Sequence, residues 1–123
     1  NVLKLNVNEF SVVKKLLRLS GDERKILNEL SGKYSLRLIA LTRGREGSIL
    51  YSESKISKHE GYRVEVEDTV GAGDAFVAAL VTGLLRGYEL DDLHNKANRV
   101  ASYICSKHGA TPSLTDEIRQ LFI

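Results

Sequence analysis

The chain has 123 residues, of which 42% are hydrophobic and 28% are charged. This composition is typical of a folded globular protein and excludes an intrinsically disordered chain. The 18 Lys and Arg residues against 16 Asp and Glu leave a formal net charge of +2, which is too small to indicate a nucleic-acid-binding protein. The single Cys excludes an internal disulfide framework.

The longest strongly apolar stretch, Ala75 to Leu85, is far shorter than the about 20 residues that span a bilayer. No signal peptide is recognisable, so we expect a cytoplasmic protein with no membrane partner. The chain begins at Asn1 and contains no Met, and we therefore expect it to be a piece of something longer.

The first part of the sequence predicts a strand followed by two helices. Val2 to Leu5 is a short apolar run typical of a strand. Apolar residues then recur at helical spacing from Phe10 to Leu17, which predicts a helix that begins near Glu9. A second apolar stripe, centred on Leu27, predicts another helix, which we expect Gly32 to end.

The middle of the sequence predicts short strands joined by turns. Leu36 to Thr42 is apolar enough for a buried strand, and Ser48 to Ser52 predicts a second one after the turn Arg43 to Gly47. Lys55 to His59 predicts a short exposed strand, and the alternation from Tyr62 to Val66 predicts another.

The last part predicts a loop and then helices. Asp68 to Gly73 is a loop of small residues, and a helical stripe follows from Phe76 to Leu85. A second stripe runs from Ala97 to Cys105, and Asp116 to Phe122 predicts a last short helix. Strands mixed with helices in this order predict a layered α/β fold.

The most informative segment is the string DTVGAGDAF, from Asp68 to Phe76. Gly71 and Gly73 allow a tight turn that points several backbone N–H groups in one direction, and such groups at a helix start bind anions. The Asp74 carboxylate can take a proton from a hydroxyl while these groups stabilise charge on a transferring phosphoryl group. The glycines alone equally allow a structural turn in which Asp74 only caps a helix.

The longer string DTVGAGDAFVAALV resembles the second signature of the ribokinase-like (PfkB) carbohydrate kinases. The resemblance implies that Asp74 is the catalytic base, which deprotonates the sugar hydroxyl that attacks the γ-phosphate of ATP. It also implies that the backbone of Gly71, Ala72 and Gly73 forms the anion hole.

Parts of this family bind an activating monovalent cation, such as K⁺, near the same signature. The resemblance implies that Asp68 and the carbonyl of Val70 are ligands of this cation. His108 departs from the residues usual where the cation loop closes, which weakens the match at this site.

The segment KLNVNE resembles the family's N-x-x-E motif after a strand. Asn6 and Glu9 occupy the matching positions, and the resemblance implies that they help to organise Mg²⁺ and the phosphates, with Glu9 acting on Mg²⁺ through water. Oxygen ligands of this kind are what Mg²⁺ requires. The structural alternative is that Asn6 or Asn8 caps the following helix.

The segment LTRGREGS resembles the family's T-x-G-x-x-G turn after a buried strand. The resemblance implies that Thr42, Gly44 and Gly47 lie along the phosphates and ribose of the nucleotide. Arg43 stands where the family often has a small or apolar residue, so it either adds phosphate affinity or faces solvent. The structural alternative is an ordinary β-turn.

Asn98 lies in a segment that resembles the family's last long helix, at a position that commonly borders adenine. The alternative is an Asn that faces solvent. His59 and His94 have polar neighbours and no partner at metal-ligand spacing, and we expect both at the surface.

Together these motifs predict an α/β chain that is the C-terminal part of a ribokinase-like layered α/β/α fold. We expect residues 1–123 to form a single ATP-binding and catalytic portion of a sugar kinase, without the N-terminal substrate half and the lid. The cut would expose a strand edge, so we expect a homodimer or association through that edge.

The expected function is that of an ATP- and Mg²⁺-dependent phosphotransferase acting on a sugar hydroxyl, with fructokinase-type enzymes as the most similar subfamily. The alternatives are a nucleoside or 2-keto-3-deoxygluconate kinase of the same family, and a non-catalytic nucleotide-binding fragment. Without a sugar pocket the chain alone cannot position an acceptor, and we expect it to be inactive by itself.

Overall fold

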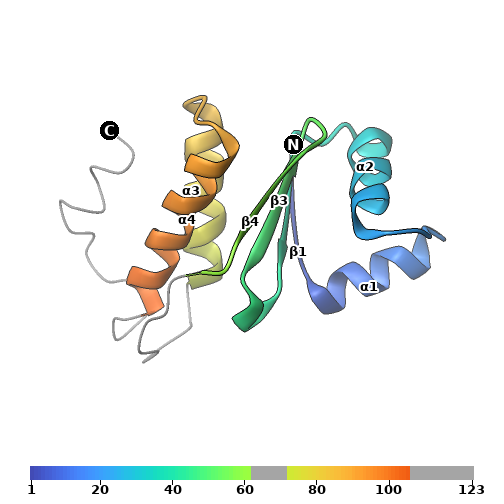
Figure 1. The fold of residues 1–123 in the computed structure, drawn as a ribbon, viewed down its shortest axis with the longest axis horizontal. Coiled ribbons are helices and arrows are strands. Elements are labelled where there is room, and N and C mark those ends of the chain that lie inside the picture. Colours follow the sequence, from blue (N-terminus) through green and yellow to red (C-terminus); the bar gives the residue numbers. More distant parts are fainter. Residues whose placement is uncertain (62–71, 106–123) are drawn as a thin grey trace. The chain divides into compact units, whose positions relative to one another are not determined.

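The computed structural model describes residues 1–61 and 72–105 (Figure 1). The chain divides into two compact units, residues 1–60 and the unit from residue 61 onward, and each is described here by itself. The strand predicted at Tyr62 to Val66 and the short helix predicted at Asp116 to Phe122 lie outside the described residues.

The first unit is a four-stranded sheet with two helices (Figure 1). Its elements are β1 (Val2–Asn6), α1 (Val7–Leu16), α2 (Glu23–Tyr34), β2 (Leu38–Thr42), a 3-10 turn η1 (Gly44–Glu46), β3 (Ser48–Ser52) and β4 (Lys55–His59). The strands lie in the order β1-β2-β3-β4. β1 and β2 are parallel because two helices connect them, whereas the short turns around β3 make its two pairings antiparallel.

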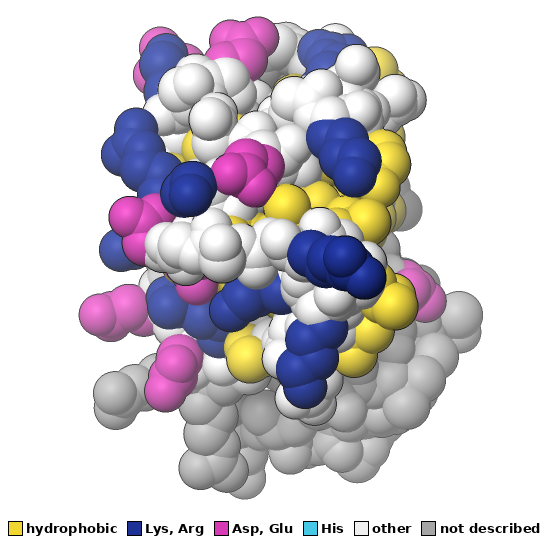
Figure 2. Space-filling model, turned by 90° about the vertical axis from the view of Figure 1, so that its right-hand side faces the viewer, with side chains coloured by type: hydrophobic (Ala, Val, Ile, Leu, Met, Phe, Trp, Pro, Cys, Tyr) yellow, Lys and Arg dark blue, Asp and Glu magenta, His cyan; other side chains and the backbone are white. Residues whose placement is uncertain are grey.

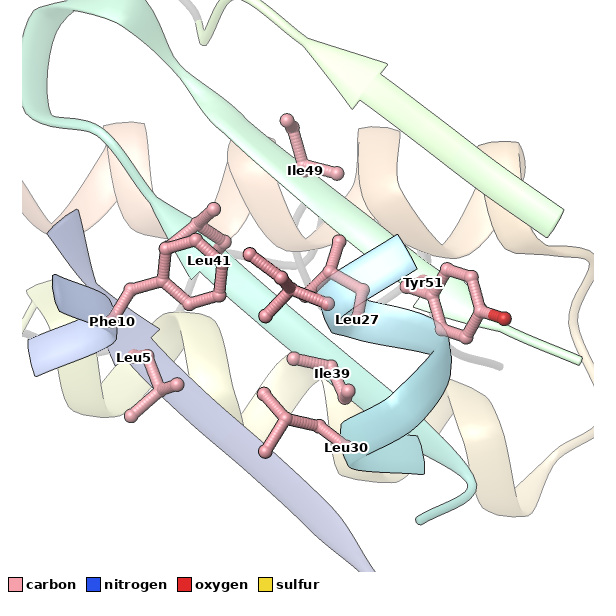
Figure 3. Close-up of a cluster of buried hydrophobic side chains, with 9 residues drawn as sticks. Leu5, Phe10, Leu27, Leu30, Ile39, Leu41, Ile49 and Tyr51 are labelled. Carbon is pink, nitrogen blue, oxygen red and sulfur yellow. The ribbon is translucent and has the colours of Figure 1, made fainter. Parts of the chain in front are cut away.

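The core of this unit lies between the helices and one face of the sheet, and Figure 3 shows its side chains converging. The strands place alternate residues on this face, so their apolar side chains meet the apolar stripes of the helices. The buried members are Leu5, Phe10, Ile26, Leu27, Leu30, Ile39, Leu41, Ile49 and Tyr51. The polar end of Tyr51 is satisfied, since its Oη donates to Oδ1 of Asn28 at 2.6 Å.

The strands were predicted closely from apolar runs, but the end of α2 was not. Gly32 does not end the helix, which continues to Tyr34. The chain turns instead at Ser35, whose φ of 52° is left-handed and whose N–H donates to the carbonyl of Ser31. A glycine inside an exposed helical turn costs only about 1 kcal/mol relative to alanine, and the buried stripe of α2 offsets this cost.

The outer side of α1 and α2 carries many basic side chains. Figure 2 shows Lys and Arg interspersed with Asp, Glu and hydrophobic side chains on this side of the molecule. Lys15, Arg18 and Arg24 are exposed, and so is the apolar side chain of Leu16, at 75%. This mixture of charges is typical of a solvated helical face.

The second unit contains two helices that pack side by side, α3 (Ala72–Leu85) and α4 (Leu90–Cys105) (Figure 1). Their short connection makes them an antiparallel pair. The approach is close at Gly83, where an added Cβ would overlap Cδ1 of Leu93 and lie 3.1 Å from Cδ2 of Tyr88. α3 begins at Ala72, so Ala72 and Gly73, which were expected in the loop, are helical.

His94 corrects another expectation, because it is completely buried. Its ring meets the ring of Phe76 edge-on, with centroids 6.5 Å apart. The polar neighbours in sequence were misleading, since the period of α4 places His94 beside the buried Leu93 and Ala97. None of the helices within residues 1–61 and 72–105 is both long and apolar enough to cross a membrane.

Candidate active site

Asn6 and Glu9 form a reciprocal cap at the start of α1. The backbone N–H of Glu9 donates to Oδ1 of Asn6, and the N–H of Asn6 donates to Oε1 of Glu9, both at 2.8 Å. This is the capping box in which two helix donors are satisfied by side chains. Asn6 therefore caps the helix, as the structural alternative predicted, and Asn8 is not the cap. The cap also fixes the positions of both side chains, which are exposed.

Thr42 lies beside Asn6 at the carboxyl ends of two neighbouring parallel strands. The two residues are Cα partners in the register of β1 and β2. Oγ1 of Thr42 approaches the carbonyl oxygen of Leu5 at 3.5 Å. In open α/β sheets, ligands bind outside the carboxyl ends of the strands, and the fold brings the two predicted motifs together at such an edge.

The turn after Thr42 has a defined backbone. The N–H of Arg43 donates to the carbonyl of Gly47 at 2.8 Å, and the N–H of Gly47 donates to the carbonyl of Gly44 at 3.2 Å. Gly44 and Gly47 both have positive φ, at 60° and 91°. A Cβ at Gly44 would meet nothing within 4 Å, whereas one at Gly47 would overlap the carbonyl oxygen of His59. Gly44 thus leaves open space, and Gly47 allows the backbone at the end of β4 to come close.

The environment of the Arg43 side chain is a feature that sequence reasoning did not find. The side chain is partly exposed, but its Nε atom is buried and has no hydrogen-bond partner among the described residues. An unpaired buried donor is uncommon in native proteins. The sequence left open whether Arg43 adds phosphate affinity or faces solvent, because burial of one atom depends on the folded turn.

In the second unit, Gly73 and Asp74 lie in the first turn of α3, and both are exposed. A carboxylate in this position interacts favourably with the positive end of the helix dipole. Within residues 1–61 and 72–105, the Asp74 carboxylate takes part in no ion pair. The first turn of α3 therefore presents an accessible carboxylate at the N-terminal end of a helix.

Asn98 does not face solvent, because it is only 8% exposed in α4. Its Nδ2 donates to the carbonyl oxygen of His94 at 2.8 Å. Gly61 is nearby, since a Cβ built there would lie 3.9 Å from Oδ1 of Asn98. The side chain is thus held by its own helix at the place where this unit begins.

Several predicted site residues lie outside the described part of the chain. These are Asp68, Val70 and Gly71, and the side chain of Ala72 is also not described. The structure therefore brings together Asn6, Glu9, Thr42, Gly44 and Gly47 in the first unit. It places Ala72, Gly73 and Asp74 in one helical turn of the second unit.

The first unit fits a magnesium ion that is bound mainly by phosphates and water. The described residues contain no group of three or more His, Cys, Asp or Glu side chains that could hold a metal. Glu9 nevertheless offers an exposed carboxylate, and the cap engages only its Oε1 within these residues. Mg²⁺ is commonly held by one or two carboxylates together with substrate phosphates, so the residues present fit this ion.

A family model described as pfkB family carbohydrate kinase matches residues 1–117. The chain belongs to the pfkB family of carbohydrate kinases. This confirms the resemblance that the glycine-rich string, the N-x-x-E segment and the T-x-G-x-x-G turn indicated.

Curated relatives include 5-dehydro-2-deoxygluconokinases. The enzyme of Bacillus subtilis (strain 168) is 32% identical over 117 residues, which are 93% of this chain and 35% of the relative. The enzyme of Bacillus anthracis (strain CDC 684 / NRRL 3495) is 27% identical over 107 residues, or 86% of this chain and 32% of the relative. The chain thus spans about a third of the length of these relatives.

Solved structures share the fold. A 2-dehydro-3-deoxygluconokinase from Thermotoga maritima gives a TM-score of 0.79 at 21% identity, covering 98% of this chain and 40% of its own. A nucleoside kinase from Methanocaldococcus jannaschii, described as a member of the ribokinase family, gives a TM-score of 0.80 at 22% identity. The match covers 99% of this chain and 39% of the nucleoside kinase. At these identities the likeness establishes the ribokinase-like α/β fold alone.

Proposed function

We propose that residues 1–123 are the ATP-binding and catalytic portion of a longer sugar kinase, which transfers the γ-phosphoryl group of ATP to a hydroxyl of its substrate. The observation that carries this proposal is Asp74, an exposed carboxylate in the first turn of α3 that directly follows Gly73. Membership in the pfkB family supports the same reaction.

In the proposed reaction Asp74 takes the proton of the attacking hydroxyl. The acceptor oxygen forms a bond to the γ-phosphorus, and the bond from that phosphorus to the β–γ bridging oxygen breaks, so ADP leaves. The backbone N–H groups of Gly71, Ala72 and Gly73 stabilise the negative charge of the transferring group. They do so as oriented donors at the positive end of a helix.

Asn6 and Glu9 are proposed to hold the magnesium and phosphate end of the nucleotide, with Glu9 acting on the ion through water. When bound, Mg²⁺ supplies charge neutralisation for the phosphate oxygens. Thr42, Gly44 and Gly47 are proposed to follow the phosphates and ribose. The register that pairs Asn6 with Thr42 supports a joint role for the two motifs.

Asn98 is proposed to border the adenine, where its burial would restrict the side chain to one position. Asp68 and the carbonyl of Val70 are proposed ligands of a monovalent cation. A structural neighbour, phosphofructokinase-2 of Escherichia coli, is described in complex with potassium, and this supports a search for K⁺ dependence.

Calorimetry of the 123-residue chain with Mg·ATP tests the nucleotide part of the proposal. We expect saturable binding that weakens when Mg²⁺ is removed by a chelator. Absence of binding at millimolar nucleotide, in a sample that is folded by circular dichroism, would contradict it. A structural neighbour supports this choice of ligand, since a ribokinase II from E. coli is described in complex with ATP and Mg²⁺.

The acceptor is proposed to be a sugar or sugar acid. The curated relatives are named for 5-dehydro-2-deoxygluconate, whereas the motifs alone favoured a fructokinase-type enzyme. Initial rates of the longer enzyme with fructose, 5-dehydro-2-deoxygluconate, 2-keto-3-deoxygluconate and a nucleoside distinguish these substrates. The largest kcat/KM identifies the substrate class, and no phosphorylation of any of them would favour the alternative of a non-catalytic nucleotide-binding protein.

We also propose that the chain associates through the edge of β1, as a homodimer or with another chain. β1 pairs with β2 on one side and is the last described strand on the other. An unpaired strand edge is a template for further pairing. Light scattering tests this, and a monodisperse, stable monomer would contradict it.

A further inference from the structure

One charged group in the first unit lacks the partners that its burial calls for. The Nε atom of Arg43 is buried, and no acceptor among the described residues is within hydrogen-bond distance. No carboxylate in this part of the chain lies within 4.0 Å of the guanidinium, including that of Glu46 on the same turn. Removing an N–H donor from water without a protein acceptor is unfavourable.

The turn that carries Arg43 restrains its backbone and sets its position in the fold. The N–H of Arg43 donates to the carbonyl of Gly47 at 2.8 Å, and its carbonyl accepts from the N–H of Glu46 at 3.1 Å. It follows Thr42 directly, and Thr42 is the register partner of Asn6 at the carboxyl ends of β1 and β2. Arg43 is thus a restrained, partly buried cation at the edge of the sheet where ligands of such folds bind.

We infer that Arg43 is a phosphate-binding residue, whose guanidinium donates hydrogen bonds to an oxygen of the nucleotide's phosphate chain. The inference rests on the proposed function and extends it to a residue outside Thr42, Gly44 and Gly47, the positions that match the motif. Guanidinium is planar and always charged, and its donors match two oxygens of one phosphate. A phosphate oxygen would provide the acceptor that Nε does not find among the described residues.

This arrangement separates the role of Arg43 in binding from any role in stability. Because Nε is unpaired within the described residues, substitution by an apolar side chain of similar length removes a buried donor and leaves no broken hydrogen bond. Arg43→Met should therefore leave the denaturation midpoint of the free chain unchanged or raise it. If the Arg43 side chain stabilised the turn, the substitution would instead lower the denaturation midpoint.

The test is the affinity of the 123-residue chain for Mg·ATP and for magnesium tripolyphosphate, which lacks the nucleoside. Arg43→Met should weaken both by about tenfold, the effect of losing a charge-assisted hydrogen bond. Arg43→Lys should lose less, since it keeps the charge but not the fork of donors. The matched control is Arg37→Met, because Arg37 is an exposed residue at the opposite end of β2 and its loss changes the net charge equally.

The outcomes separate this inference from the proposed function. If the wild-type chain binds Mg·ATP and Arg43→Met binds it equally well, the inference is wrong and the proposed function stands. Equal losses for Arg43→Met and Arg37→Met would also overturn it, because the effect would then be one of net charge. A loss for ATP without a loss for tripolyphosphate would assign the contact to the nucleoside and overturn it as well. If the folded wild-type chain binds neither ligand, the proposed function fails first.

Discussion

Asn6 and Thr42 are partners across the parallel strands β1 and β2, each at the last position of its strand. They are far apart in sequence, and α1 and α2 form most of the connection between them. The pairing places the N-x-x-E segment and the T-x-G-x-x-G turn at one edge of the sheet. A phosphate chain that contacts one of these motifs is therefore within reach of the other.

Glu9 has two roles that substitution can separate. Glu9→Gln keeps an oxygen that accepts from the Asn6 N–H, so the cap survives and stability should change by less than about 0.5 kcal/mol. The lost charge should weaken the dependence of nucleotide binding on Mg²⁺. Glu9→Ala should lose both the cap, at about 1 kcal/mol, and the Mg²⁺ effect.

Urea denaturation and calorimetry at several Mg²⁺ concentrations measure the two effects of the Glu9 variants. Asn8→Ala is a control for stability, since Asn8 is exposed in the same turn and is not the cap. If Glu9→Gln bound Mg·ATP as the wild type does at every Mg²⁺ concentration, Glu9 would have only its structural role.

Gly44 and Gly47, the two glycines of the T-x-G-x-x-G turn, should differ sharply in their tolerance of a side chain. Gly47→Ala places a Cβ against the carbonyl oxygen of His59 and 2.7 Å from Cα of Glu60, at a φ of 91°. Both neighbours are backbone, so relief requires β4 to move, and we expect a loss of about 3 kcal/mol or more. Gly44→Ala meets open space and should cost only about 1 kcal/mol for its φ of 60°.

Equilibrium unfolding in urea measures this difference between Gly44→Ala and Gly47→Ala. The two variants carry the same chemical change three positions apart, so the denatured states differ little. Equal losses of stability for the pair would show that the close approach of β4 to the turn contributes nothing.

Gly32→Ala should stabilise the chain by about 0.5 to 1 kcal/mol. Gly32 is exposed inside α2, has no positive φ, and an added Cβ would meet nothing within 4 Å. Alanine therefore gains helix propensity without a clash. Thermal denaturation checks this, and a lower midpoint than that of the wild type would mean that the glycine has a role which its surroundings do not reveal.

The success and failure of sequence reasoning follow from what each signal reports. Apolar runs located β2 and β3 within two residues, because buried strands need continuous apolar surface. Gly32 was wrongly predicted to end the helix. Glycine can adopt the left-handed conformation that commonly ends a helix, but it does not have to adopt it. The helix ends at Tyr34 and is capped by the left-handed Ser35, which nothing in the local composition marks.

The site shows the same limit. The resemblance of the motifs to the family predicted Asn6, Thr42 and Asp74 as site residues. Burial could not be predicted in this way. His94 is buried although its polar neighbours suggested the surface, and the burial of Asn98 excludes the solvent-facing alternative that the sequence left open. The unpaired Nε of Arg43 was invisible for the same reason, because it results from tertiary packing around one atom.

Asp74→Asn is the decisive substitution for the proposed chemistry. Asparagine has nearly the same shape as aspartate and fits the same position in the first turn of α3. It cannot, however, take the proton of the acceptor hydroxyl. In the longer kinase that we propose contains residues 1–123, kcat should fall by at least about 100-fold. KM for ATP should change by less than about threefold, because the phosphates are proposed to be held by backbone N–H groups and by the first unit.

Asp91→Asn is the matched control for Asp74→Asn. Asp91 is an exposed carboxylate in the first turn of α4, so both substitutions remove one negative charge from the positive end of a helix dipole. Any general effect of that change on folding or on nucleotide affinity should be shared by the two variants, whereas the loss of kcat should be confined to Asp74→Asn. Wild-type turnover by Asp74→Asn would exclude this carboxylate as the base, and an equal loss of kcat in both variants would assign the effect to helix stability and not to proton transfer.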